Sequence, residues 1–109
     1  MRALIVNGSK NEQEILKKML LETKKIESIR LVNGFEGTKV AKWLMPDLVF
    51  IFLLPQRYQE IEDFKKRTKS KIIAIGEIED LIPAMEKGAK GFILRPLKED
   101  LEYFTLCCH

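Results

Sequence analysis

The chain has 109 residues, which suits a single domain with a modest core. Its hydrophobic content of 46% and charged content of 32% are ordinary for a globular protein, and a net charge of +3 is too small to indicate nucleic-acid binding. The longest N-terminal apolar run, Ala3 to Val6, is too short for a signal peptide or a membrane span. We therefore expect a cytoplasmic protein that binds neither nucleic acid nor membrane.

Short apolar runs alternate with amphipathic stretches from the N-terminus onward. The run from Ala3 to Val6 is apolar throughout, which predicts a strand buried on both faces. Ser9 or Asn11 can cap the helix that follows, since each has a glutamate three residues later. The apolar positions of this helix have helical spacing: Ile15, Leu16, Met19 and Leu20. A second strand is predicted over Ile29 to Val32, before the turn pair Asn33-Gly34.

The same alternation continues to the C-terminus. Three further strands are predicted over Leu48 to Leu53, Ile72 to Ile75 and Phe92 to Leu94. The helix before the third strand has apolar positions at Val40, Ala41 and Leu44 and ends before Pro46, and the helix after that strand has them at Ile61 and Phe64. The helix before the fifth strand has them at Leu81, Ile82, Met85 and Ala89, with Gly88 ending the helix. The last helix has them at Leu97, Leu101, Phe104 and Leu106. The pattern predicts one α/β domain over residues 1–109, doubly wound, with a five-stranded parallel sheet of strand order 2-1-3-4-5 and helices on both faces.

Two segments resemble the receiver domain of two-component response regulators, the CheY-like family. Pro46-Asp47-Leu48-Val49 is similar to the start of that family's central strand. Gly88 to Pro96 is similar to its Gly-Ala-x-x-aromatic-x-x-Lys-Pro segment, in which the Lys-Pro bond is cis. Asn33-Gly34 stands where the family has Asp-Gly, and the separation of Asn7 from Phe52 suits the family's site. The resemblance implies the flavodoxin-like, CheY-like fold and a role in two-component signal transduction or a phosphorelay.

The chemistry of that family depends on residues that this chain lacks. By the resemblance, the phosphoacceptor aspartate aligns with Phe52, and the acidic pair that helps to hold magnesium aligns with Asn7 and Gly8. Phenylalanine has no oxygen to phosphorylate, and one neutral amide is a poor ligand for a hard cation. The family's Ser or Thr aligns with Gly76, and its lysine with Arg95. We therefore expect a degenerate pseudo-receiver with no metal, no cofactor and no enzymatic activity.

Three of these positions allow more than one interpretation. Phe52 is either a mimic of one switch state or a core residue that fills a vacated pocket, and we favour the second because burial of the ring is stabilising. Phe92 aligns with the family's switch aromatic, and is either locked inward or simply packed. Arg95 is expected to pair with Glu77 or to lie in solvent, with an anion site beside Asn7 as the alternative.

Without phosphotransfer, we expect the protein to act through contacts with other proteins. The family's docking surface is its fourth helix, fifth strand and fifth helix, so we expect a homodimer, a kinase, a receiver or an output domain to bind there. The candidate surface residues are Leu81, Met85, Phe92, Leu94, Leu101 and Phe104. Trp43 and Tyr58 are single aromatics beside helices, and we expect them to be half-buried. The chain is either a stand-alone module or the N-terminal piece of a longer protein.

The alternative function is a small flavodoxin-like cofactor-binding or enzymatic module, since ligands of such sheets bind at the carboxyl ends of the strands. Asn7 to Asn11 has residue types of a phosphate loop but lacks the Ser/Thr-rich pattern of an FMN loop. A cluster of basic residues is interpreted as a solvated helix end: Lys65, Lys66, Arg67, Lys69 and Lys71. Cys107, Cys108 and His109 are interpreted as a frayed tail, because no second pair completes a zinc site.

Overall fold

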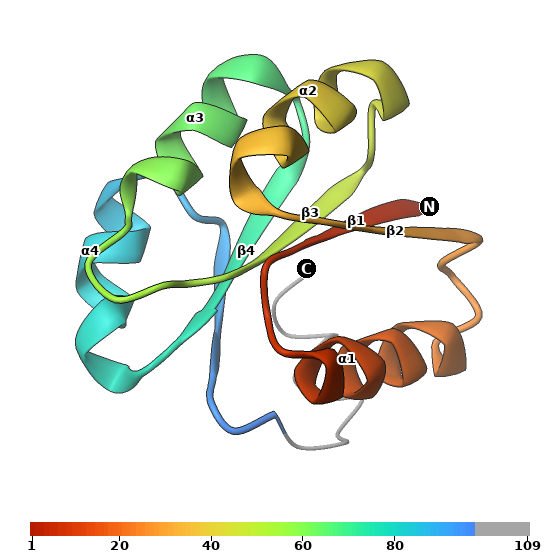
Figure 1. The fold of residues 1–109 in the computed structure, drawn as a ribbon, viewed down its shortest axis with the longest axis horizontal. Coiled ribbons are helices and arrows are strands. Elements are labelled where there is room, and N and C mark those ends of the chain that lie inside the picture. Colours follow the sequence, from red (N-terminus) through yellow and green to blue (C-terminus); the bar gives the residue numbers. More distant parts are fainter. Residues whose placement is uncertain (98–109) are drawn as a thin grey trace.

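The computed structural model of the protein describes residues 1–97, apart from the side chain of Phe35. Strands and helices alternate along this part of the chain (Figure 1). The strands are β1 (Arg2–Val6), β2 (Ser28–Val32), β3 (Leu48–Phe52), β4 (Lys71–Gly76) and β5 (Gly91–Leu94). The helices are α1 (Lys10–Glu22), α2 (Gly34–Leu44), α3 (Gln59–Arg67), the short 3-10 helix η1 (Ile78–Asp80) and α4 (Leu81–Glu86). The predictions for Leu101, Phe104, Leu106 and Cys107 to His109 lie outside the described residues.

The strands form one sheet in the order β2-β1-β3-β4-β5, and every neighbouring pair is parallel. This confirms the order predicted from the sequence. All five residues of β3 are buried, and so are the four apolar residues of β1. Strands covered on both faces belong in the middle of a doubly wound sheet, which is where β1 and β3 lie.

Helices cover both faces of this sheet, as the alternation predicted. In Figure 1, α1 lies on one side of the strands, and α2 and α3 lie on the other. Leu16 and Leu20 of α1 pack with Phe50 and Phe52 in one buried cluster. The second cluster joins the opposite face of the sheet to α2, α3 and α4 through Ala41, Ile61, Phe64 and Ala84. The alternating side chains of β3 therefore contribute to two separate cores.

Details of the fold agree with the sequence in some places and differ in others. The Arg95–Pro96 peptide bond is cis, as the resemblance implied. Gly88 follows the end of α4 and has a φ of 109°, a conformation that glycine adopts at little cost. The predicted inward position of Ile82 is wrong, because its side chain is 69% exposed and Ala84 is the buried residue of α4. The 3-10 turn η1 directly precedes α4, so the helical spacing of the apolar residues does not run unbroken into this helix. Within residues 1–97, no helix has both the length and the apolar character that a membrane crossing requires.

Candidate functional site

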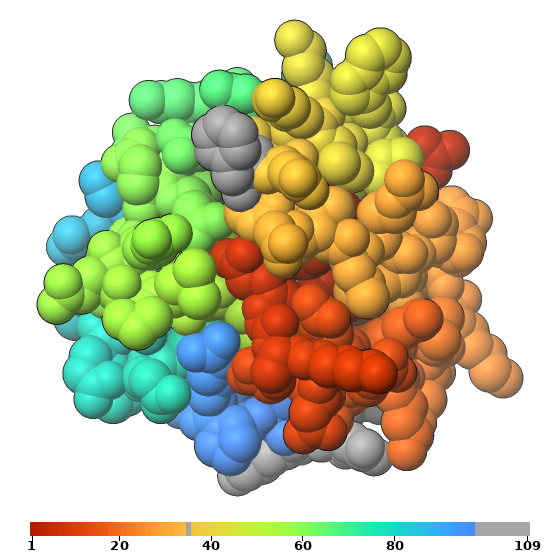
Figure 2. Space-filling model, in the orientation of Figure 1, coloured from red at the N-terminus to blue at the C-terminus, as the bar shows by residue number. Residues whose placement is uncertain are grey.

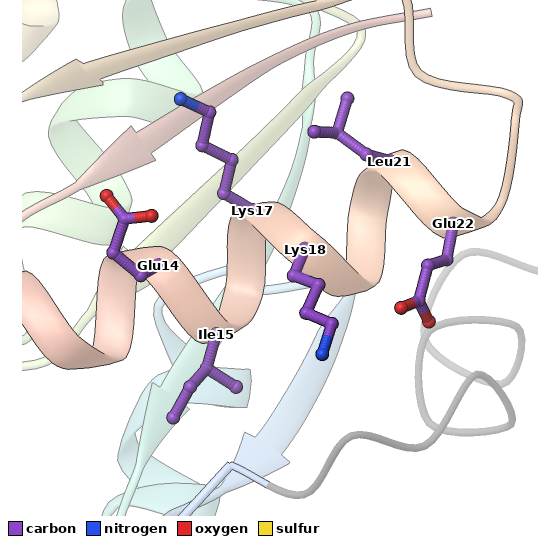
Figure 3. A pocket seen from close by; sticks show the side chains of 6 residues that line it. All are labelled: Glu14, Ile15, Lys17, Lys18, Leu21 and Glu22. Carbon is purple, nitrogen blue, oxygen red and sulfur yellow. The ribbon is translucent and has the colours of Figure 1, made fainter.

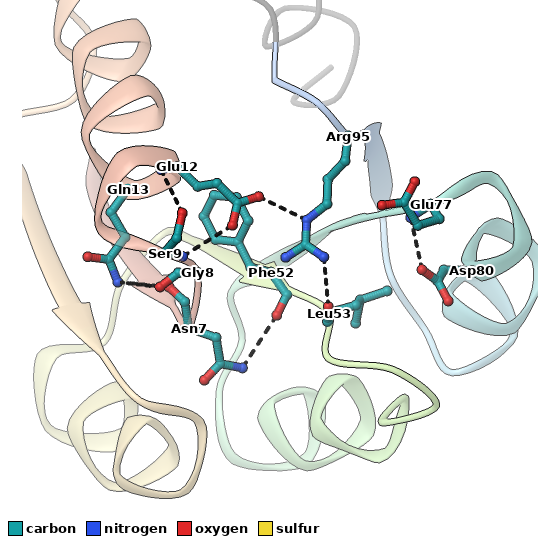
Figure 4. Close-up of polar contacts among 10 residues, drawn as sticks. All are labelled: Asn7, Gly8, Ser9, Glu12, Gln13, Phe52, Leu53, Glu77, Asp80 and Arg95. Atoms are coloured by element: carbon teal, nitrogen blue, oxygen red, sulfur yellow. Dashed lines mark hydrogen bonds and ion pairs between the residues drawn. The ribbon is translucent and has the colours of Figure 1, made fainter.

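The carboxyl ends of β1, β3, β4 and β5 meet at one edge of the sheet, together with the loops that follow them (Figure 4). Asn7 and Gly8 follow β1, and Phe52 ends β3. Gly76 ends β4, and Arg95 directly follows β5. Ligands of parallel α/β sheets bind at this edge, so these residues form the candidate site.

Phe52 occupies the centre of this edge. Its side chain is 0% exposed and belongs to the core cluster on the α1 side of the sheet, with Ile75 and Ile93. The expected burial of Phe52 is therefore confirmed. Burying a ring of this size contributes about 2 kcal/mol or more to stability. The ring of Phe52 is therefore part of the core at this edge and is not exposed to solvent.

Gly8 permits the close approach of the β1–α1 loop to this ring. Its φ is 90°, and a Cβ placed on it would lie only 2.6 Å from Cδ2 of Phe52. Both the backbone conformation and the missing space select glycine at this position. The second position of the expected acidic pair therefore has no room for a side chain while Phe52 is present.

Arg95 closes the site from the side of β5. Its Cζ lies 5.6 Å from the centroid of the Phe52 ring, and its Nη1 donates a hydrogen bond to the carbonyl of Leu53 at 3.2 Å. Its Nε lies 3.0 Å from Oε2 of Glu12, an ion pair in which the N–H is not aligned for a hydrogen bond. The predicted pairing of Arg95 with Glu77, or its placement in solvent, is wrong, because the end of β5 faces the start of α1. In Figure 2 the blue end of the described chain lies against the red-orange segment that contains the start of α1, and Figure 4 shows the side chains of Arg95 and Glu12.

Both carboxylate oxygens of Glu12 have partners. Oε1 accepts a hydrogen bond from the backbone N–H of Ser9 at 3.1 Å, while the backbone N–H of Glu12 donates to Oγ of Ser9 at 3.1 Å. This is the capping box that the spacing of Ser9 and Glu12 predicted. Oε2 is the partner of Arg95. The carboxylate is thus held at the helix start and neutralised there.

Asn7 joins three loops instead of facing an open pocket. Its Oδ1 accepts from the backbone N–H of Gly34 at 2.9 Å. Its Nδ2 lies 3.4 Å from the carbonyl oxygen of Phe52 and 3.4 Å from both carboxylate oxygens of Glu60. The backbone carbonyl of Asn7 accepts from Nε2 of Gln13 at 2.9 Å. Asn7 therefore holds the ends of β1, β2 and β3 in register through hydrogen bonds.

The residues at this edge do not fit the magnesium ion that receiver domains bind. Such an ion prefers several anionic oxygens that converge on one point. Here Glu12 is committed to Arg95, Gly8 has no side chain and Phe52 has no side-chain oxygen. Across residues 1–97, no group of three or more His, Cys, Asp or Glu side chains is placed to hold a metal ion.

Asp80 occupies the space beside Gly76. A Cβ on Gly76 would lie 2.7 Å from Oδ2 of Asp80, and this oxygen accepts from the backbone N–H of Glu77 at 2.9 Å. Oδ1 of Asp80 accepts a hydrogen bond from the hydroxyl of Tyr58 at 2.6 Å. This hydrogen bond, helped by partial burial and by the negative charges of Asp80 and Glu79, raises the pKa of Tyr58 above 10.0. The carboxylate of Asp80 thus ties the β4–α4 loop to the β3–α3 loop.

The other predicted residues lie away from this centre. Phe92 is half-buried and packs on the core that α2, α3 and α4 cover, which suits either interpretation of its role. Tyr58 is half-buried as expected, whereas the prediction for Trp43 is wrong, because its side chain is 87% exposed on the last turn of α2. On the candidate partner surface, Leu81 is half-buried, and Met85 and Leu94 are 44% and 42% exposed.

Sequence reasoning missed the roles of Glu12, Glu60 and Asp80 at this edge. The capping box indicated where Glu12 lies, but its second partner depends on how β5 ends beside α1. The contact of Asp80 with Tyr58 joins residues 22 positions apart, and no local pattern indicates it. Ile78, the first residue of the docking surface expected from the sequence, is exposed at the start of η1.

A separate pocket lies on the outer side of α1 (Figure 3). It is lined by charged and apolar side chains of one helix: Glu14, Ile15, Lys17, Lys18, Leu21 and Glu22. Lys17 and Leu21 lie one helical turn apart on one side of the helix, and Ile15 and Lys18 lie on the other (Figure 3). None of these residues belongs to the edge where Phe52 and Arg95 meet, so this pocket is not part of the candidate site.

No protein-family model matches the sequence, and a search of curated proteins also finds no match. Solved structures do match over nearly the whole chain. The signal receiver domain of a response regulator designated NarL from Mycobacterium tuberculosis is 16% identical, with a TM-score of 0.81, covering 98% of this chain and 94% of that one. A two-component response regulator from Clostridium difficile is 22% identical, with a TM-score of 0.77, covering 99% and 93%.

A third similar structure is the signal receiver domain of a signal transduction histidine kinase from Syntrophus aciditrophicus. It is 26% identical, with a TM-score of 0.70, covering 99% of this chain and 85% of that one. With TM-scores of 0.70 to 0.81 over nearly the whole chain, these structures share the overall fold found here. The chain therefore has the CheY-like receiver-domain fold.

Proposed function

We propose that this protein is a signalling module of the receiver fold that does not accept a phosphoryl group and acts by binding other proteins. The burial of Phe52 under Arg95 carries the proposal. A phosphoacceptor needs an exposed carboxylate and a cation to neutralise the incoming phosphoryl group. At this edge the ring of Phe52 takes the place of the exposed carboxylate, and the cation Arg95 already has Glu12 as its partner. The module is accordingly not an enzyme.

The proposed contact surface is the face formed by η1, α4 and β5. Four large apolar side chains are exposed there, with exposed fractions of 60% for Ile78, 69% for Ile82, 44% for Met85 and 42% for Leu94. Apolar side chains gathered on one face favour a protein contact over solvent. The partner is a kinase, a receiver or an output domain, or a second copy of the chain.

The absence of phosphotransfer is tested with acetyl phosphate and magnesium, followed by intact mass. We expect no gain of one phosphoryl group. A gain of one phosphoryl group that disappears in Glu12→Gln, Glu60→Gln or Asp80→Asn, the carboxylates at this edge, would contradict the proposal.

The contact surface is tested with Ile82→Lys, using Lys17→Glu on α1 as a charge-changing control away from this face. Ile82→Lys introduces a charge at an exposed position, so the fold should tolerate it. If the chain self-associates through this face, sedimentation should show that Ile82→Lys abolishes the dimer while Lys17→Glu leaves it unchanged. If the chain is monomeric, the same pair of variants is compared in binding to kinases and output domains encoded in the same genome. Equal behaviour of both variants in every assay would refute the surface.

A further inference from the structure

The opposite edge of the sheet, at the amino ends of the strands, contains a hollow of about 750 Å³. One wall is the last turn of α2 and the segment that leads into β3, from Ala41 to Leu48. The other wall is the end of α3 and the segment that leads into β4, from Lys66 to Lys71. A volume of this order accommodates several side chains of a ligand.

Four cationic side chains line this hollow without an ion-pair partner among residues 1–97: Lys42, Arg67, Lys69 and Lys71. The remaining lysine of the lining, Lys66, lies 3.6 Å from Oε1 of Glu62. Asp47 is the acidic residue of the lining, and its Oδ2 already accepts a hydrogen bond from the backbone N–H of Arg2 at 2.8 Å. The hollow therefore has an excess of positive charge that the described part of the chain does not neutralise.

Helix ends alone do not account for these charges. Cations in the last turn of a helix compensate its dipole, which explains Lys42 of α2 and Arg67 of α3. Lys69 lies beyond the end of α3, and Lys71 is the first residue of β4. Both are exposed, and they add charge where no helix requires it.

The walls of the hollow are fixed by hydrogen bonds. The backbone N–H of Lys71 donates to the carbonyl of Asp47 at 3.0 Å, and Oγ of Ser70 donates to the carbonyl of Pro46. Oγ1 of Thr68 donates to the carbonyl of Phe64 at 3.0 Å. A binding surface with a rigid backbone loses little conformational entropy when a ligand binds.

Apolar groups accompany the charges. Ala41 and Leu48 are buried at the hollow, and the side chain of Met45 is 76% exposed at its rim. Trp43 is 87% exposed in the same turn of α2, although it does not line the hollow. A matching ligand therefore carries carboxylates together with at least one apolar side chain.

We propose that this hollow binds an acidic segment of a partner protein, in which carboxylates flank a large apolar side chain. This surface is distinct from the face of η1, α4 and β5, so it adds a second contact to the proposed function. Protein is favoured over nucleic acid because the cations gather in one hollow instead of a long stripe, and none of the described side chains that line the hollow is an aromatic ring for base stacking.

The probe is a short synthetic peptide of alternating glutamate and leucine with one central phenylalanine. Its counterparts are the same peptide with glutamine in place of glutamate, and an oligothymidine strand. Binding is followed through backbone-amide NMR shifts of the full chain. We expect the acidic peptide to shift amides of Lys42 to Leu48 and Lys66 to Lys71, with an affinity that falls as salt is added.

Matched double variants locate the site. Lys69→Gln with Lys71→Gln should weaken peptide binding about fivefold, because two rim charges are lost. Lys42→Gln with Arg67→Gln, which removes one charge from each wall, should weaken binding by a similar factor and guards against a folding defect confined to Lys69 and Lys71. Lys10→Gln with Lys17→Gln removes equal charge from α1 and should leave the affinity unchanged. The proposal is overturned by equal binding of all three variants, by absence of peptide binding, by equal binding of the glutamine peptide, or by tighter binding of the oligonucleotide at the same amides.

Discussion

The guanidinium of Arg95 lies over the ring of Phe52, with Cζ 5.6 Å from the ring centroid. The pair connects the residue after β5 to the last residue of β3, across the edge where receiver domains hold their phosphoryl group. The partners of the Arg95 guanidinium are thus a ring face, a backbone carbonyl and Glu12. Such a contact contributes about 0.5–2 kcal/mol when it is partly shielded from water.

Arg95 and Glu12 should be energetically coupled. Glu12→Gln keeps an acceptor for the backbone N–H of Ser9 but removes the charge that faces Arg95. Arg95→Gln removes the other charge. Because both side chains are mostly buried, we expect the double variant to be more stable than the sum of the two single losses predicts, by about 0.5–1 kcal/mol. Urea denaturation of the four proteins measures this coupling, and strictly additive losses would show that the ion pair contributes nothing.

The topology could be predicted from the sequence because its determinants are local. Fully apolar runs such as Ala3 to Val6 identify the central strands, and right-handed crossovers then leave few possible orders. It is harder to predict which side chains of a short helix face the sheet. The apolar residues of α4 fit more than one helical face, and the structure buries Ala84 and exposes Ile82.

The candidate site was predicted in outline but not in its contacts. The position and burial of Phe52 follow from its place at the end of an apolar strand. The partner of Arg95 does not, because the choice between Glu12 and Glu77 depends on which loop reaches the end of β5. Asp80 was missed for the same reason, since its hydrogen bond to Tyr58 depends on how two loops meet.

Gly8→Ala should destabilise the protein through Phe52. The new Cβ would lie 2.6 Å from Cδ2 of the ring, on a backbone with a φ of 90°. We expect a loss of about 1–3 kcal/mol from overpacking and backbone strain. In a Phe52→Leu background the overlap with the ring disappears, so Gly8→Ala should cause a smaller loss of stability there. Thermal melts of the four proteins measure the difference; an equal cost in both backgrounds would show that the ring does not restrict the loop.

Gly76→Ser should lower the pKa of Tyr58. A Cβ on Gly76 would lie 2.7 Å from Oδ2 of Asp80, so the carboxylate must move and its hydrogen bond to Tyr58 weakens. The pKa of Tyr58 should then fall back toward 10.0, and Asp80→Asn should shift it in the same direction. Tyrosinate absorbance during an alkaline titration measures this pKa, with Tyr58→Phe to identify the signal of Tyr103. A pKa that stays raised in both variants would contradict the assigned cause.

The same hydrogen bond makes stability depend on pH. The pKa of Tyr58 is raised in the folded protein, so its contribution is complete below pH 10.0 and is lost as the pH rises through the folded value. The stability difference between wild type and Tyr58→Phe should therefore shrink in that alkaline range. Urea denaturation at neutral pH and above pH 10.0 compares the stability of wild type and Tyr58→Phe. A stability difference that stays constant would argue against a pH-dependent contribution of this hydrogen bond.

Glu62 should contribute to stability at neutral pH but not in acid. Its Oε2 lies 3.4 Å from Nζ of Lys87, and this hydrogen bond and charge, followed by the charge of Lys66, lower the pKa of Glu62 below 4.5. A lowered pKa stabilises the fold above pH 4.5, and the contribution is lost as the pH falls through the folded value. Glu62→Gln should thus lose less stability than wild type between neutral pH and strong acid. Glu86→Gln, on the exposed end of α4, is the control and should follow the wild type.

Phe52→Asp should not recreate a working receiver site. The new carboxylate would lie in the core position that is 0% exposed, beside Ile75 and Ile93. Its charged form would be desolvated with only Arg95 close by, so the pKa of the new aspartate should rise or the edge should loosen. Removing the ring and burying a polar group together should cost about 2–4 kcal/mol, whereas Phe52→Leu should cost less. Gly76 supplies no hydroxyl, so binding of a phosphoryl mimic would have no route to Phe92.

Thermal melts of wild type, Phe52→Leu and Phe52→Asp, each with and without magnesium and beryllofluoride, measure both effects. If Phe52→Asp is as stable as wild type and is stabilised further by the two ligands, the edge is a preserved receiver site and the ring of Phe52 is not a structural replacement for it.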